Sequence, residues 1–81
     1  TQQRIVDTLR GQGVSEERIR YALANGQIET GGYDPRVISG ERRSSAGATG
    51  LFQFLPSTWE RMYGTRNVDV GFEAQMRAFQ E

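Results

Sequence analysis

Residues 15–32 read SEERIRYALANGQIETGG and give the clearest structural signal in the chain. Ser15 is a good N-cap, and the two glutamates after it lie in the first turn, where the helix dipole favours acidic side chains. From Ile19 onwards, apolar and small residues recur at i, i+3, i+4 and i+7, which is typical of a helix with one buried face. Gly31 and Gly32 end the pattern. We therefore predict a helix here that turns one face towards the core.

Three more helices are predicted around this one. Residues 2–10 carry apolar side chains at helical spacing, which predicts a helix that ends at Gly11. Pro56 suits the first position of a helix that runs to residue 63. Asp69 is the expected N-cap of a last helix, whose apolar positions at i, i+4 and i+7 are Phe72, Met76 and Phe79.

The segments between the helices are irregular. Asp34-Pro35 opens a turn, and residues 36–38 are expected to form a short extended stretch. Residues 40–50 (GERRSSAGATG) are rich in glycine and serine and indicate a loop, whereas residues 51–55 (LFQFL) form an apolar run that fits a strand or a turn. The predicted fold is a single mostly α domain over residues 1–81, with about four helices around a short irregular or β centre, as a piece of a longer chain.

The composition excludes several classes of function. Ten arginines balance ten acidic residues, so the chain lacks the basic excess of a nucleic-acid-binding domain. No apolar stretch approaches the roughly 20 residues needed to span a bilayer, and we expect no membrane span. The chain has no cysteine and no histidine, which excludes Ser-His and Cys-His nucleophiles and thiolate metal sites. We expect no metal and no cofactor, so that any chemistry belongs to carboxylates, hydroxyls and amides.

One carboxylate, Glu29, lies in an unusual place on the predicted helix. At about 100° per residue, it lies within about 20° of Ala22 and about 60° of Gly26, at the edge of the buried face. Its position in the last turn places its negative charge against the helix dipole, and partial burial opposes the charge as well. Both effects favour the protonated carboxyl, which a general acid requires. An ordinary solvated glutamate in the last turn is the alternative.

Residues 29–59 read ETGGYDPRVISGERRSSAGATGLFQFLPSTW, which resembles the signature of lysozyme-like lytic transglycosylases of the soluble (SLT) type. In that signature a catalytic Glu precedes a Pro, a Ser, a Gly-Ala-x-Gly-Leu-x-Gln segment and a second Pro. Here Glu29, Pro35, Ser39, residues 47–53 (GATGLFQ) and Pro56 occupy those places in order. The Pro-Ser-Thr-Trp ending is similar to that of resuscitation-promoting factors, and the flanking helices are similar to phage tail-lysozyme domains. The likeness covers the chain from residue 13 to residue 81.

Three features depart from the family pattern. Thr30 follows the glutamate where the family usually has serine, which keeps a hydroxyl at this position. The loop between Ser39 and Gly47 is longer than usual, so that Ser39, Ser44 and Ser45 compete for the family's serine position. The C-terminal helices of the SLT type, with their Ala-Tyr-Asn-x-Gly segment, are not found within these 81 residues.

The resemblance implies a lysozyme-like α+β fold and cleavage of peptidoglycan glycan strands between N-acetylmuramic acid and N-acetylglucosamine. Glu29 would protonate the glycosidic oxygen and then act as base while the sugar's own 6-hydroxyl attacks, leaving a 1,6-anhydro end. One carboxyl can serve both steps by microscopic reversibility. The protein would act on the bacterial cell wall or be carried in a phage virion, where other chains of such a complex could be its partners.

Three residues are candidates for substrate binding beside the glutamate. Gln53 would contact N-acetyl or carbonyl groups, as in the family, unless its side chain bonds its own backbone. Tyr33 would stack on a sugar face or else close the end of the core. Phe52 is a candidate contact next to Gln53, although core packing is the default for it and for Phe54.

The serines and the other acids leave alternatives open. Ser39 or Ser44 would bond the catalytic carboxyl or the sugar, and a turn serine is the alternative for each. A hydrolysing muramidase of the same fold would need a second carboxylate, about 5–5.5 Å away for retention or about 6.5–9.5 Å for inversion. Asp34 and Glu41 are the nearby candidates, but Asp34 also suits a cap for the turn at Pro35.

Two interpretations without catalysis also stay open. The chain could be a catalytically silent module of a virion or cell wall that keeps the fold. It could also be a small helical adaptor that docks a partner helix on the stripe formed by Phe72, Met76 and Phe79.

Overall fold

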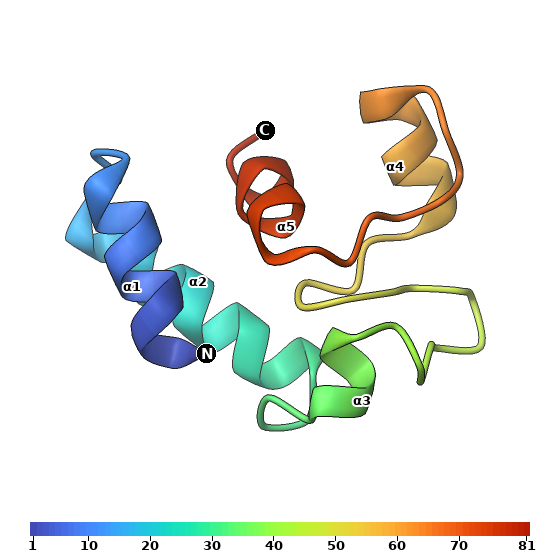
Figure 1. Cartoon of the computed structure of the whole chain (residues 1–81), viewed down its shortest axis with the longest axis horizontal. Helices are drawn as coiled ribbons and strands as arrows, with labels where there is room; N and C mark the ends of the chain where they lie inside the picture. Colours follow the sequence, from blue (N-terminus) through green and yellow to red (C-terminus); the bar gives the residue numbers. More distant parts are fainter.

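The structure, a computed structural model, describes all 81 residues, and five helices form along them. In chain order these are α1 (Gln2–Gly11), α2 (Glu16–Glu29), α3 (Pro35–Ile38), α4 (Pro56–Tyr63) and α5 (Phe72–Phe79). The paired α1 and α2 occupy one side of the molecule and α4 the other, with α5 between them (Figure 1). The prediction of a mostly helical fold is confirmed, with one helix more than expected. None of the five has the length and apolar character needed to cross a membrane.

The turn between α1 and α2 forms as the sequence predicts. Gly13 has a φ of 77°, a conformation that costs glycine little and allows the chain to reverse. Ser15 caps α2 by accepting a hydrogen bond from the amide of Arg18 at 3.3 Å. Arg10 and Glu16 pair across the turn through two hydrogen bonds of 2.8 and 2.9 Å. That pair lowers the pKa of Glu16, but both side chains are exposed, so it adds little to stability.

The segment after α2 corrects the prediction of an extended stretch, because residues 35–38 form the short helix α3. Asp34 starts this helix by accepting a hydrogen bond from the amide of Arg36 at 2.9 Å. Pro35 occupies the first turn, where its missing N–H has no intrahelical partner to lose. The Asp-Pro pair therefore acts as a cap and a first helical position, which outweighs the extended preference of the residues that follow.

Residues 49–54 form a tight turn and not a strand, which settles the alternative left open for this apolar run. Thr49 and Phe54 make the one bridge-type pair, through two backbone hydrogen bonds of 3.0 and 3.1 Å. Gly50 has a φ of 89°, and a Cβ on it would come within 3.0 Å of the side chain of Gln75. Glycine at this position therefore serves both the turn and the close approach of α5.

Gln75 is a buried polar residue that joins α5 to this turn. Its side chain is 0% exposed. Oε1 accepts a hydrogen bond from the amide of Phe52 at 3.3 Å, and Nε2 donates one to the carbonyl of Asp69 at 2.8 Å. Both ends of the amide are used, so burial leaves neither unsatisfied. Gln75 thus fixes the 49–54 turn against the start of α5.

The last helix begins two residues later than expected. Gly71 is the N-cap of α5, and Asp69 does not cap it. Instead, the Asp69 carboxylate accepts a hydrogen bond from the amide of Gly71 at 2.8 Å, which makes a local turn before the helix. The preceding helix, α4, starts at Pro56 as predicted and ends at Gly64, which has a φ of 77°.

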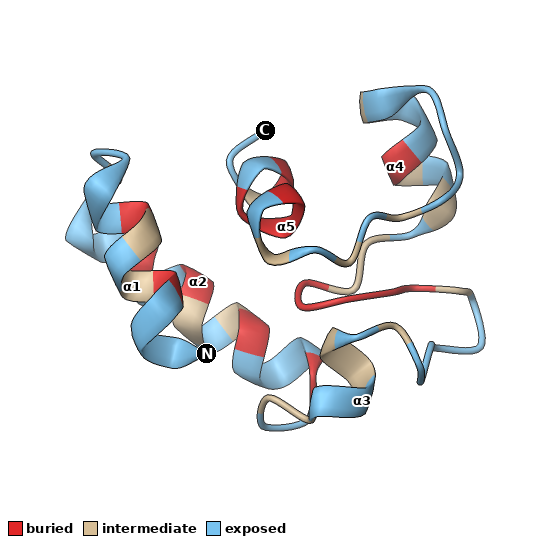
Figure 2. Ribbon diagram, in the orientation of Figure 1, coloured by how far each residue is buried: buried red, intermediate tan, exposed pale blue.

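The core lies where α1, α2, α5 and the 49–54 turn meet (Figure 2). Its buried members come from all four segments and are Ile5, Leu9, Ile19, Ala22, Leu51, Phe52 and Met76. A smaller cluster joins α4 to α5, where Trp59 packs against Ala74 and Ala78. Each fully buried aliphatic side chain contributes about 1.5–3 kcal/mol, so these few residues carry most of the packing. Met76 is completely buried in this core. It therefore cannot contact a partner helix, as the adaptor interpretation of the stripe formed by Phe72, Met76 and Phe79 requires.

Candidate active site

Glu29 is the last residue of α2, and its side chain is exposed. The expected partial burial is wrong, because the room beside Gly26 is filled by the ring of Tyr33. A Cβ on Gly26 would lie 3.2 Å from Cε1 of that ring and 3.6 Å from the side chain of Leu51. The three ion pairs of the structure involve other acids, and no hydrogen bond reaches the Glu29 carboxylate. The carboxylate is therefore accessible to a ligand.

The residue after Glu29 fixes the end of the helix. Thr30 is 1% exposed, and its hydroxyl donates a hydrogen bond of 2.6 Å to the carbonyl of Gly26. The same oxygen accepts a hydrogen bond of 2.7 Å from the amide of Tyr33. The hydroxyl thus joins the last turn of α2, which carries Glu29, to the turn that follows it.

Tyr33 closes the end of the core. It has a φ of 65°, its hydroxyl donates a hydrogen bond to the carbonyl of Leu23, and its ring packs against the main cluster. Burial raises the pKa of Tyr33. Two roles were considered for Tyr33, stacking on a sugar face and closing the end of the core. In this structure its ring closes the core.

The candidate serines both serve turns. The Ser39 hydroxyl donates to the carbonyl of Arg36 at 3.2 Å and accepts from the amide of Glu41 at 3.4 Å. Ser44 accepts a hydrogen bond of 2.9 Å from the amide of Ala48. No hydrogen bond joins either serine to the end of α2, so the bond expected between one of them and the Glu29 carboxylate stays a prediction.

Gln53 bonds its own backbone, which was the alternative to substrate binding. Its Nε2 donates a hydrogen bond of 2.9 Å to the carbonyl of Gly50, and its own φ is 52°. The side chain is half-buried, and Oε1 keeps free lone pairs. Phe52 beside it is 6% exposed and belongs to the core, as the default interpretation holds.

The second-carboxylate candidates differ in their surroundings. The Asp34 carboxylate accepts the Arg36 amide and pairs with the Arg36 guanidinium at 3.3 Å. The hydrogen bond from that amide, together with the guanidinium, lowers the pKa of Asp34. The cap predicted for Asp34 is therefore confirmed. Glu41 is exposed in the loop after α3. No group of three acids lies close enough to hold a metal ion.

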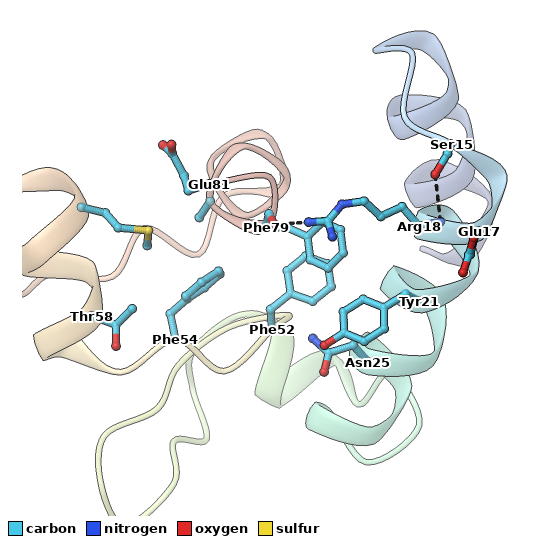
Figure 3. A pocket seen from close by; sticks show the side chains of 12 residues that line it. Ser15, Glu17, Arg18, Tyr21, Asn25, Phe52, Phe54, Thr58, Phe79 and Glu81 are labelled. Carbon is cyan, nitrogen blue, oxygen red and sulfur yellow. Dashed lines mark hydrogen bonds between the residues drawn. The ribbon is translucent and has the colours of Figure 1, made fainter.

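A cavity of about 730 Å³ lies between α2, the 49–54 turn, α4 and the end of α5 (Figure 3). One wall comes from the start and middle of α2 and consists of Ser15, Glu17, Arg18, Tyr21 and Asn25. The facing wall includes Phe52, Phe54, Thr58, Met62, Phe79 and Glu81. In Figure 3 the rings of Phe52 and Phe79 lie between the α2 side chains and those of Phe54 and Thr58.

Of the predicted site residues, Phe52 alone lines this cavity. The residues that sequence reasoning missed form a row on α2, in which Glu17, Tyr21 and Asn25 follow one another at four-residue intervals. Glu29 is the next member of the same row. From Asn25 it is displaced by about 6 Å along the helix axis and about 40° around it. The i, i+4 spacing was visible in the sequence, but the facing wall comes from distant segments.

Comparisons with protein families, with curated protein sequences and with solved structures found no match to this chain.

Proposed function

We propose that this chain cleaves the glycan strands of peptidoglycan as a lysozyme-like lytic transglycosylase, with Glu29 as general acid and then general base. The observation that carries the proposal is the place of Glu29. It is an accessible, unpaired carboxylate at the end of α2, one turn beyond Asn25, which lines a large cavity. The proposal also rests on the likeness of residues 29–59 to the SLT signature.

The volume and lining of the cavity suit a saccharide. About 730 Å³ lies within the roughly 300–1,000 Å³ of ligand pockets. A strand that extended from the cavity past Asn25 to the end of α2 would bring one glycosidic oxygen to Glu29, which would donate its proton as the bond breaks. The resulting carboxylate would then accept the proton of the sugar's 6-hydroxyl, whose oxygen attacks the anomeric carbon and closes the 1,6-anhydro ring.

The surroundings of two other acids, Glu17 and Asp34, support this one-carboxylate route over hydrolysis. Glu17, the other acid of the row, lies about 18 Å away along the helix axis. A hydrolase needs its carboxyl groups about 5–9.5 Å apart. Asp34 is engaged by Arg36 and serves as the cap of α3. Hydrolysis with a second carboxylate is the chemical alternative.

The test is the release of soluble fragments from purified peptidoglycan sacculi. We expect Glu29→Gln to lower the rate by about 10²–10⁴-fold, which is the usual contribution of a general acid–base group. Glu73→Gln is the matched control, because it removes an exposed carboxylate of α5 that does not line the cavity, and it should leave the rate unchanged. Equal rates for Glu29→Gln and the unaltered chain would overturn the assignment.

One observation favours a second function, that of a silent module which binds the wall without cutting it. Gln53, the family's substrate-contacting residue, has its amide nitrogen committed to the carbonyl of Gly50. A silent module should sediment with sacculi yet release no fragments from them, even though circular dichroism shows it to be helical. Release that depends on Glu29 would reject this second function.

A further inference from the structure

The cavity contains a continuous aromatic surface that starts on α2. The ring of Tyr21 lies 6.0 Å from that of Phe79, which lies 4.8 Å from that of Phe52, and Phe54 follows at 6.4 Å from Phe52. Tyr21 is 59% exposed, although it is a large aromatic residue in the middle of a helix. Its own ring therefore contributes little to the core and offers a face to the cavity.

The polar groups around this surface are not used by the fold. The side chains of Glu17 and Asn25 lie one turn to either side of Tyr21, and Thr58 lies on the facing wall. None of these three side chains makes a hydrogen bond within the chain, whereas other polar groups nearby do. Arg18, for example, lies over the Phe79 ring at 5.1 Å and donates to the Phe79 carbonyl at 3.4 Å.

The charged and polar residues of the cavity walls indicate which class of ligand the cavity can bind. Two carboxylates, Glu17 and Glu81, face one guanidinium, that of Arg18, so phosphates and other anions are disfavoured. A purely apolar partner helix would cover Glu17 and Asn25 without satisfying them, at a cost of about 1–3 kcal/mol for each group. A neutral pyranose satisfies both conditions, because it has an apolar C–H face and a rim of hydroxyl and amide groups.

We infer that the cavity binds neutral N-acetylhexosamine units, with Tyr21 as the stacking platform and Asn25 as a hydrogen-bonding partner for the N-acetyl or hydroxyl groups. Tyr21 lies about 12 Å from Glu29 along the helix axis and about 80° around it, so a strand that reached both would cross the surface of α2 obliquely. The strand would run along α2 from Glu29 towards the start of the helix. This inference rests on the proposed function and adds which residues hold the strand and which sugar they prefer.

The experiment uses the Glu29→Gln variant, so that binding is measured without turnover. A trimer of β-1,4-linked N-acetylglucosamine is titrated into the ¹⁵N-labelled chain while amide resonances are followed. We expect the largest shifts at Tyr21, Asn25 and Phe79. A second substitution in this variant, Tyr21→Ala, should raise the dissociation constant about tenfold, as truncation of an aromatic contact residue does. Adding Tyr21→Phe should change it less than threefold.

Two controls make the result specific. Gln27→Ala alters another exposed side chain of α2, which lies about 120° around the helix from Tyr21 and does not line the cavity, and it should leave the dissociation constant unchanged. N-acetylmuramic acid, which carries a carboxylate, should shift the same amides less than N-acetylglucosamine does at equal concentration. The inference is overturned if the trimer does not bind, if it shifts amides elsewhere, or if a folded Tyr21→Ala chain binds it equally well. These outcomes are separate from the cleavage assay, which alone decides the role of Glu29.

Discussion

Two turns of this molecule hold a residue other than glycine at positive φ, and they are supported in different ways. The turn after α2 places Tyr33 at 65°, and the turn before α4 places Gln53 at 52°. Each is held by a buried polar side chain. Thr30 holds the first through partners four residues before and three residues after it. Gln75 holds the second through a partner 23 residues away. The first support is local, and the second depends on the whole fold.

This difference predicts the largest effect for the long-range support. Gln75→Ala would leave the amide of Phe52 and the carbonyl of Asp69 without partners and open a cavity in the core. We expect a loss of about 3 kcal/mol or more in the free energy of unfolding, measured by urea denaturation. Gln75→Met fills the space without the hydrogen bonds and separates the two causes. A loss below 1 kcal/mol for the alanine variant would show that the turn does not need this support.

The local support should matter less. Thr30→Val keeps the shape of the side chain but removes the hydroxyl that accepts the amide of Tyr33 and donates to Gly26. We expect a loss of about 1–3 kcal/mol in the free energy of unfolding. Thr30→Ser restores the hydroxyl and should recover most of it. If the serine variant is as unstable as the valine variant, the methyl group and not the hydroxyl fixes this turn.

These two turns also mark how far the sequence predicts the structure. The cap at Ser15 and the start of α4 at Pro56 follow from local chemistry, and both are confirmed. Gln75 looks like a polar position of an amphipathic helix, and nothing near it in the sequence indicates a buried partner. The prediction was also wrong at Asp69, where an aspartate before a helix can either cap the helix or make a local turn. Its carboxylate makes the turn.

The candidate site divides in the same way. Glu29 could be singled out because its helix and the motif after it are continuous in sequence. The cavity could not, because its aromatic surface joins Tyr21 to Phe79, and their contact depends on how α5 packs. Local motifs therefore single out Glu29, whereas long-range packing forms the cavity.

A smaller effect, with a dependence on pH, is expected at the Tyr33 hydroxyl. Tyr33→Phe removes the hydrogen bond to the carbonyl of Leu23 and should cost about 1 kcal/mol at neutral pH. Burial raises the pKa of Tyr33 above its unfolded value of 10.0. The stability from this group is therefore fully present below pH 10 and is lost as the pH rises through the folded pKa. Denaturation of both chains at pH 8 and 11 tests this, and a gap that widens at pH 11 contradicts it.

The smallest effect is expected at Gln53, where two terms oppose each other. Gln53→Gly relieves a left-handed conformation that costs other residues roughly 1–2 kcal/mol, but glycine loses about 0.5–1 kcal/mol in unfolded-state entropy. The hydrogen bond to the carbonyl of Gly50 is lost as well. Urea denaturation should therefore place the variant within about 1 kcal/mol of the unaltered chain. A larger loss would mean that this side chain supports the turn, as Gln75 does.

The most direct test of the central claim, that Glu29 acts alone as acid and base, is the chemical nature of the ends it produces. Fragments released from sacculi by the unaltered chain and by Glu29→Gln can be compared by mass spectrometry. We predict 1,6-anhydromuramic ends from the unaltered chain and none from the variant. Reducing muramic ends would contradict the one-carboxylate route, and anhydro ends that persist in the variant would contradict the role of Glu29.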